Sequence, residues 1–81
     1  MSHDWQTQDG ALVRERQFAD FAAALAYVNA VGALAEDRGH HPDILLHGWN
    51  RVRLSLVTHE AGGAVTDADH ALAAAIDALE P

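Results

Sequence analysis

The sequence predicts an α+β fold: a four-stranded antiparallel sheet with two helices packed on one face, in the order β-β-α-β-β-α. Three observations predict it. Two segments carry apolar residues at helical spacing, each behind a residue suited to cap a helix. The remaining apolar segments come in neighbouring pairs, and a short turn joins each pair, as antiparallel strands require. At 81 residues the chain has room for one modest core, so a single domain over residues 1–81 is expected.

The first pair of strands is predicted around Asp9-Gly10. Residues 1–8 lead into a short strand, and residues 11–18 form the returning strand of a hairpin. Aspartate and glycine both tolerate the positive φ angles that a tight turn needs. Apolar and polar residues alternate weakly in the returning strand, because Leu12 and Phe18 share a face with two arginines.

The strongest helix is predicted to begin after Asp20, whose carboxylate can accept hydrogen bonds from the first free backbone N–H groups. Gly39 is placed to end this helix in the left-handed conformation, and Pro42 prevents it from restarting. The apolar residues between them recur at steps of three and four and form one stripe: Phe21, Ala24, Leu25, Val28, Val31, Gly32 and Ala35.

The second pair of strands is predicted over residues 44–49 and 51–59, joined at Gly48-Trp49-Asn50. A flexible loop follows at residues 61–63. Thr66 then begins the last helix, and Thr66-x-x-Asp69 matches a capping box in which aspartate replaces the commoner glutamate. One face of this helix is apolar, formed by Leu72, Ala75, Ile76 and Leu79.

Composition excludes several classes of function. Five Lys and Arg residues against twelve Asp and Glu give a net charge of -7, which disfavours direct nucleic-acid binding. All five basic residues are arginines, and the four on predicted strands are placed to form a local positive patch. The longest apolar stretch, residues 21–28, is far too short to span a bilayer. The polar N-terminus lacks a signal-peptide pattern, so no membrane contact and a cytoplasmic location are expected.

The chain contains no cysteine, so no disulfide can add stability to so small a core. A domain of this size is marginally stable alone. Association into homo-oligomers is therefore expected.

A histidine pair, His40 and His41, directly follows the first helix, and a third histidine, His59, ends the last predicted strand. Imidazole moves protons readily near neutral pH, so a proton-transfer site is the first hypothesis. The alternative is that histidines near a helix C-terminus only cap its carbonyl groups. Two acids in the same turn, Glu36 and Asp37, oppose the helix dipole, and such violations concentrate at functional sites. Glu36 lies four residues before His40 and is expected to orient its ring.

Two of these residues have a simpler alternative role. His59 shares a strand face with Arg53 rather than with the core residues, which suits either ligand contact or plain surface exposure. Asp69 suits helix capping better than direct chemistry. A zinc site is a weaker alternative for the histidines, because adjacent residues seldom bind one ion and the chain lacks cysteine ligands and a His-Glu-x-x-His helix. No metal site is therefore expected.

Taken together, the spacing of these residues resembles that of the pterin-4a-carbinolamine dehydratase family. Six residues separate the His-His-Pro run from an aromatic residue, nine more precede a histidine, and another nine precede an acid. The resemblance extends over residues 20–79, and the matching positions are Glu36, His40-His41-Pro42, Trp49, Thr58-His59 and Asp69.

The resemblance implies an oligomeric enzyme, a homodimer or homotetramer, that needs no metal or organic cofactor. It implies dehydration of 4a-hydroxytetrahydropterin, such as 4a-hydroxytetrahydrobiopterin, to quinonoid dihydropterin during tetrahydrobiopterin recycling. His40 and His59 correspond to the acid/base histidines and His41 to a substrate-contacting one. Supporting or substrate-binding positions are implied for Glu36, Trp49, Thr58 and Asp69. The alternative is a non-catalytic dimerisation, assembly or coactivator module on the same fold.

Overall fold

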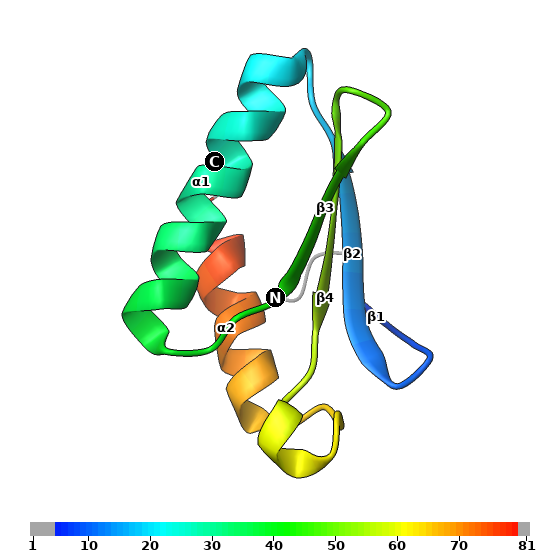
Figure 1. Cartoon of the computed structure of the whole chain (residues 1–81), viewed down its shortest axis with the longest axis vertical. Helices are drawn as coiled ribbons and strands as arrows, with labels where there is room; N and C mark the ends of the chain where they lie inside the picture. The colour runs from blue at the N-terminus through cyan, green and yellow to red at the C-terminus, as the bar shows by residue number, and fades with distance from the viewer. Residues whose placement is uncertain (1–4, 80–81) are drawn as a thin grey trace.

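The computed structural model describes residues 5–79 and confirms the predicted fold class (Figure 1). Within this described part of the chain, four strands and two α-helices follow the predicted β-β-α-β-β-α order, with one short 3₁₀ helix, η1, before the last helix. The elements are β1 (Gln6–Gln8), β2 (Ala11–Gln17), α1 (Phe21–Arg38), β3 (Asp43–His47), β4 (Arg51–Leu56), η1 (His59–Ala61) and α2 (Asp67–Asp77).

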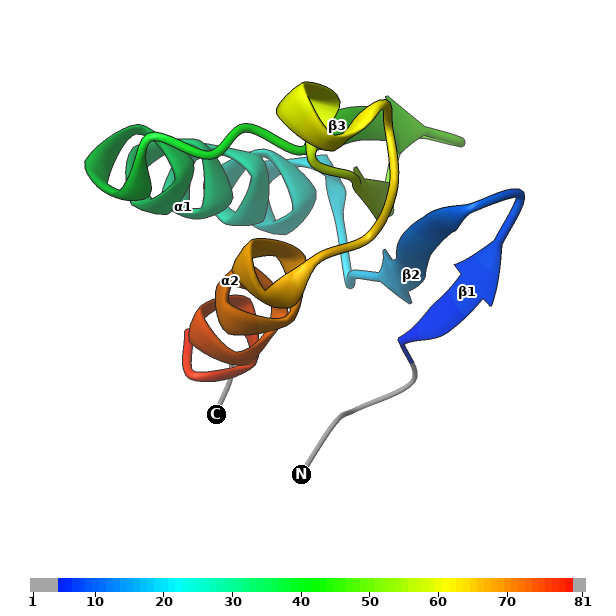
Figure 2. The same cartoon turned by 90° about the horizontal axis from the view of Figure 1, so that it is seen from below.

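The four strands form one antiparallel sheet in the order β1-β2-β4-β3. Both helices lie on the same side of this sheet, and no other element of residues 5–79 covers its opposite side (Figure 2). The strands β1 and β3 are its two edges, and β3 pairs with β4 from Asp43 opposite Ser55 to His47 opposite Arg51.

The core lies between the sheet and the helices. In β4, Val52, Leu54 and Leu56 are buried, whereas Arg51 and Arg53 are exposed, so the even-numbered residues face the helices. The helices contribute the buried residues Ala24, Tyr27, Val31 and Ala35 from α1 and Leu72, Ala73 and Ile76 from α2.

The predicted helix ends are confirmed. The Asp20 carboxylate accepts a hydrogen bond from the Ala23 backbone N–H at 2.8 Å, and Gly39 ends α1 with a φ of 65°. At the start of α2, the Thr66 hydroxyl and the Asp69 carboxylate form the expected capping box. These local signals therefore set where each helix begins and where α1 ends.

The strand ends differ from prediction. The first strand of the second hairpin ends at His47 rather than at residue 49, because Gly48 and Trp49 both adopt left-handed conformations, with φ of 55° and 60°. β4 ends at Leu56 rather than at His59. Beyond it, the Thr58 carbonyl accepts hydrogen bonds from the N–H groups of Ala61 and Gly63, which turns the chain into η1.

The register also separates the arginines that were expected to form one positive patch. Arg14 and Arg16 of β2 lie opposite Leu54 and Val52, on the helix-facing side, whereas Arg51 and Arg53 lie on the open side. Arg14 is buried: it pairs with Asp77 of α2 at 2.5 Å, donates to the Tyr27 hydroxyl at 2.8 Å, and lies over the Trp5 ring. The weak alternation of β2 thus reflects a buried charged group.

Candidate active site

One fully buried carboxylate, that of Asp69, joins three segments that are distant in the sequence. Its Oδ1 lies 2.5 Å from Nε2 of His40, at the end of α1. Its Oδ2 accepts hydrogen bonds from the Thr58 hydroxyl at 2.8 Å and from the Thr66 backbone N–H at 2.9 Å. The same side chain therefore caps α2 and contacts the first histidine of the pair.

This environment favours the ionised form of Asp69. Burial alone would raise the pKa of its carboxyl group, because it disfavours charge. The hydrogen bonds from His40, the Thr66 backbone and the Thr58 hydroxyl, with the charge of His40, outweigh that penalty and lower the pKa below its ordinary value of 3.8. An ionised acceptor at this position requires His40 to donate through Nε2.

The hydrogen bond to Asp69 determines which nitrogen of the neutral His40 ring carries the proton. With Nε2–H donated to Asp69, Nδ1 is the nitrogen that can accept or release a proton. The His40 side chain is 17% exposed, so the ring is mostly enclosed. A neighbouring carboxylate also stabilises the positive charge that forms when the ring takes up a proton.

The prediction that Glu36 orients the His40 ring was wrong. Glu36 does not contact His40: its Oε2 pairs with Nε2 of His41 instead. Both side chains of this second pair are largely exposed, at 59% for His41 and 78% for Glu36. The chain leaves the helical path at Gly39, so the residue four positions after Glu36 no longer lies on its face.

The third histidine, His59, is adjacent in the sequence to a residue that contacts Asp69. His59 is exposed and begins η1, directly after Thr58, whose hydroxyl bonds to Asp69. The end of α1, η1 and the start of α2 lie together at the lower end of the molecule in Figure 1. The fold thus brings the His40-His41 pair and the segment that carries His59 to the same end.

Trp49, another residue of the motif, lies elsewhere. It is 62% exposed and sits in the turn between β3 and β4, at the opposite end of the sheet from η1 (Figure 1). Within one protomer, the structure therefore does not bring Trp49 to the histidines.

Sequence reasoning missed the part played by Thr66. Its hydroxyl caps α2 and also lies 2.6 Å from the Thr58 hydroxyl, so both threonines support the Asp69 carboxylate. The capping box indicated Thr66 and Asp69 as a pair. The capping-box pattern did not indicate that the other carboxylate oxygen of Asp69, Oδ1, would face His40, because that contact depends on how α1 and α2 pack.

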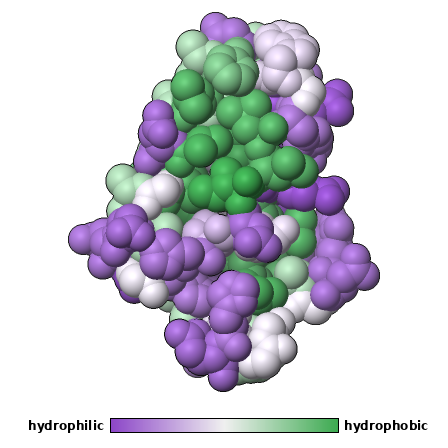
Figure 3. All heavy atoms as spheres, in the orientation of Figure 1, coloured by the Kyte–Doolittle hydropathy of each residue, from purple (hydrophilic) through white to green (hydrophobic). Residues whose placement is uncertain are grey.

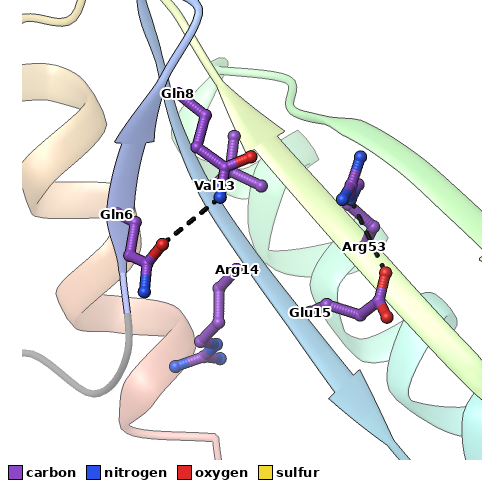
Figure 4. A pocket seen from close by; sticks show the side chains of 6 residues that line it. All are labelled: Gln6, Gln8, Val13, Arg14, Glu15 and Arg53. Atoms are coloured by element: carbon purple, nitrogen blue, oxygen red, sulfur yellow. Dashed lines mark hydrogen bonds and ion pairs between the residues drawn. The ribbon is translucent and has the colours of Figure 1, made fainter.

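A separate hollow of about 360 Å³ lies where β1, β2 and β4 adjoin (Figure 4). Its lining is mostly polar: Gln6, Gln8, Val13, Arg14, Glu15 and Arg53. The Arg14 side chain extends away from the other five toward α2, where it pairs with Asp77. The hollow shares no residue with the histidine cluster.

Within residues 5–79, no helix is long and apolar enough to cross a membrane.

The fold and the cluster define a small α+β protein with a histidine–carboxylate site at one end of its sheet. A family model described as pterin 4 alpha carbinolamine dehydratase matches residues 1–79, and the chain belongs to this family.

Relatives of similar length support the assignment. A protein of Chloroflexus aurantiacus, provisionally named a pterin-4-alpha-carbinolamine dehydratase, is 53% identical over 76 residues, which cover 94% of this chain and 80% of the relative. A protein of Acidobacterium capsulatum with the same provisional name is 53% identical over 75 residues, covering 93% and 79%.

Two solved structures share the fold, each at 31% identity. The first, described as a transcriptional coactivator/pterin dehydratase from Brucella melitensis, aligns with a TM-score of 0.85 over 96% of this chain and 83% of its own. The second is described as a pterin dehydratase-like protein identified as a RuBisCO assembly factor in the alpha-carboxysome. It aligns with a TM-score of 0.78, covering 95% and 89%.

Proposed function

We propose that this protein dehydrates a 4a-hydroxytetrahydropterin, such as 4a-hydroxytetrahydrobiopterin, to quinonoid dihydropterin and water. The reaction breaks the C4a–O bond, delivers a proton to the departing hydroxyl group and removes a proton from a ring nitrogen as a new C=N double bond forms. No electrons are exchanged with another molecule. Two proton-transfer groups are therefore sufficient, and no metal or organic cofactor is needed.

The observation that carries the proposal is the pairing of His40 with the buried, ionised Asp69. His40 takes up the ring-nitrogen proton at Nδ1, and Asp69 stabilises the imidazolium that results. His59, exposed beside the same cluster, supplies the proton to the leaving hydroxyl. His41, held at the surface by Glu36, contacts the pterin.

The test is the decay of a 4a-hydroxytetrahydropterin in the presence of the purified protein. The wild type should accelerate decay well above the buffer rate, and His40→Ala should remove most of that acceleration. His70→Ala is the matched control, because His70 is an exposed histidine on α2, outside the cluster. If the wild-type rate equals that of buffer, the enzyme proposal is wrong.

A second candidate function is a non-catalytic interaction module. The exposed apolar residues Phe21, Leu25 and Leu45 favour it, and the two structural relatives are described as a transcriptional coactivator and as an assembly factor. The two proposed functions differ in turnover, which the decay assay measures directly.

We also infer that the chain works as a homo-oligomer in the cytoplasm. A small core and this exposed apolar surface support association.

A further inference from the structure

Thr58 stands at the start of a short helix that its side chain does not cap. It is the N-cap residue of η1, where a threonine hydroxyl ordinarily accepts a hydrogen bond from the first turn, but its side chain makes no such bond. The hydroxyl instead donates to Oδ2 of Asp69 at 2.8 Å. Local preferences that a structure leaves unmet occur most often at functional sites. The Thr58 hydroxyl therefore serves the buried carboxylate rather than its own helix.

The backbone holds Thr58 in place for this bond. Its N–H donates to the Ala64 carbonyl at 2.9 Å, and its own carbonyl accepts from the N–H groups of Ala61 and Gly63 at 3.0 and 3.1 Å. Both backbone groups of Thr58 are thus engaged within the loop that contains η1. The side-chain oxygen is held beside Asp69, and the hydroxyl hydrogen is the part that can still turn.

A second threonine determines which way that hydrogen points. Oγ1 of Thr66 lies 2.6 Å from Oγ1 of Thr58 and accepts a hydrogen bond from the Ala68 backbone N–H at 3.3 Å. A threonine hydroxyl has one hydrogen to donate and can also accept. Because the ionised Asp69 can only accept, Thr58 donates to it, and the hydrogen between the two threonine oxygens belongs to Thr66. The hydroxyls therefore form a one-way donor chain from Thr66 through Thr58 to Asp69.

This donor chain ends at the His40 ring. Asp69 is fully buried, and its other oxygen, Oδ1, lies 2.5 Å from Nε2 of His40. Burial alone raises the pKa of this carboxyl group, and its hydrogen bonds, led by the one from His40, lower it. The bond from the Thr58 hydroxyl is one of them. Each donor makes the carboxylate a weaker base, so the threonine bond weakens the hold of Asp69 on the His40 proton.

Bulk water cannot take the place of these donors. On the face shown in Figure 3, the surface at the lower end of the molecule is mostly hydrophilic, and the apolar atoms gather in the upper half. Asp69 nevertheless has no exposed surface. Its hydrogen bonds must therefore come from the protein itself, and the loss of one protein donor leaves the carboxylate with one bond fewer.

We propose that Thr66 is a positioning residue of the active site: acting through Thr58, its hydroxyl limits how strongly Asp69 holds the His40 proton and so keeps Nδ1 of His40 available as a base. The part that concerns catalysis rests on the proposed function, whereas the donor chain does not. If either hydroxyl is removed, the carboxylate becomes more basic and stabilises the imidazolium form of His40. Nδ1 then keeps its proton to a higher pH, and the ring cannot act as a base below that pH.

The other charged groups at this end of the molecule stay the same when a hydroxyl is removed. Among the described residues they come from every element around His40: Glu36, Asp37 and Arg38 of α1, His41 before β3, Asp43 of β3, His59 and Glu60 of η1, and Asp67 of α2. All of them are exposed, so water and salt screen their effect on the ring. A change from threonine to valine alters none of these charges. A shift in the His40 titration of such a variant therefore reports the donor chain.

The first test follows the His40 ring by NMR without any substrate. The chain has six histidines, and the signal that is missing from His40→Ala identifies the ring of His40. Thr58→Val removes the direct donor and leaves the Thr66 cap of α2 in place, so the variant should fold. Its His40 should bind a proton about 2–10-fold more tightly than in the wild type, the range that one hydrogen bond contributes. Thr66→Val, one bond further away, should shift the titration in the same direction by a smaller factor.

A double variant shows whether the two hydroxyls act in series. If Thr66 acts through Thr58, then adding Thr66→Val to Thr58→Val should move the His40 titration no further. Independent, additive shifts would contradict the donor chain. A His40 titration that is unchanged in both single variants overturns the proposal.

Two control variants separate the donor chain from helix capping. Thr66→Ser keeps the hydroxyl and should restore the wild-type titration that Thr66→Val loses. Asp20→Ala removes the cap of α1, at the far end from His40 of an 18-residue helix about 27 Å long. It should lower stability and leave the His40 titration unchanged. If Asp20→Ala shifts that titration as much as Thr66→Val does, general loss of stability explains the shift, and the proposal is wrong.

The role in catalysis is tested by the pH profile of kcat/KM in the pterin decay assay. Since His40 must be neutral to accept a proton, the acid limb of the profile should move to higher pH in Thr58→Val and in Thr66→Val, by the factors that NMR gives. The loss of rate should be greatest in acid and shrink as the pH rises. A loss of equal size at every pH would indicate a structural defect and overturn the positioning role.

Absence of turnover in the wild type has a different meaning. It would overturn the proposed function and, with it, the part of this proposal that concerns catalysis. The NMR titrations of the same variants would still decide whether Thr66 acts on His40 through Thr58, because they need no substrate.

Discussion

Oδ1 of Asp69 lies 2.5 Å from Nε2 of His40, although the two residues are 29 positions apart in the chain. Asp69 reaches His40 while its Oδ2 caps the first turn of α2. One buried carboxylate thus performs a structural and a positioning task, and both depend on the short aspartate side chain in the capping box. The site is therefore only as well ordered as the start of α2.

Asp69→Asn should lower kcat by about 10–100-fold, as when other hydrogen-bond partners that orient a functional histidine are removed. An amide can donate to Nε2, which favours the wrong tautomer of His40 and leaves Nδ1 protonated. The change should affect kcat more than KM, measured in the pterin decay assay. A variant that folds normally and keeps full kcat would contradict the positioning role of Asp69.

The stability of the wild type should fall in acid. Because the folded-state pKa of Asp69 is lowered below its ordinary value of 3.8, the unfolded chain binds a proton more readily at this group. Its contribution is therefore fully present above the unfolded pKa and is lost as the pH falls through the folded one. Urea unfolding from pH 6 down to pH 3 should show this loss, and Asp69→Asn should flatten that part of the profile.

The three histidines should separate into two kinetic classes. His40→Ala and His59→Ala should each lower kcat by about 10²–10⁴-fold, the usual contribution of a proton-transfer group. His41→Ala should act chiefly on KM, because it removes binding that ground and transition states share. The double variant of His40 and His59 should lose less than the product of both losses if the two act as a unit. A His59→Ala protein with normal kcat would return His59 to a plain surface role.

The elements of the fold were predictable because their signals are local. The Asp20 cap, the left-handed Gly39 and the Thr66-x-x-Asp69 box each act within one turn of helix, and each lies where predicted. The end of β4 was not predictable in this way. The last residues of the predicted strand turn into η1 instead, because the Thr58 carbonyl accepts backbone hydrogen bonds from Ala61 and Gly63. The alternation of apolar and polar residues gives no sign of these bonds.

The members of the candidate site were predictable, but their pairing was not. Spacing suggested Glu36 as the partner of His40, since a helix would place both on one face. The left-handed turn at Gly39 redirects the chain, so packing of α1 against α2 selects Asp69 instead. The burial of Arg14 escaped prediction for the same reason, because its partner Asp77 is 63 residues away.

Removal of metal should leave activity unchanged. His40 and His41 direct their Nε2 atoms to different carboxylates, those of Asp69 and Glu36, so the two rings do not converge on one point through these atoms. Protein dialysed against a chelator should keep the wild-type decay rate, and added zinc should not raise it. Loss of activity on chelation with recovery on zinc addition would replace the acid/base assignment with a metal site.

The buried Arg14 should dominate the stability of the fold. Arg14 is 2% exposed and connects β2 to Asp77 of α2 and to Tyr27 of α1, so Arg14→Met leaves a largely buried carboxylate without its cation. Breaking a buried pair from one side costs about 3–5 kcal/mol, a large share of the stability of so small a domain. Urea unfolding at one fixed protein concentration measures it.

Two further variants show whether that loss comes from the unpaired charge. Arg53→Met is the exposed control: Arg53 lies 3.6 Å from Glu15 with both side chains well exposed, and its loss should cost less than about 1 kcal/mol. The double variant Arg14→Met with Asp77→Leu removes both charges, so it should be more stable than Arg14→Met alone, because no buried charge remains unpaired. Equal stability of the single and double variants would assign the loss to packing around Trp5 and Tyr27 instead.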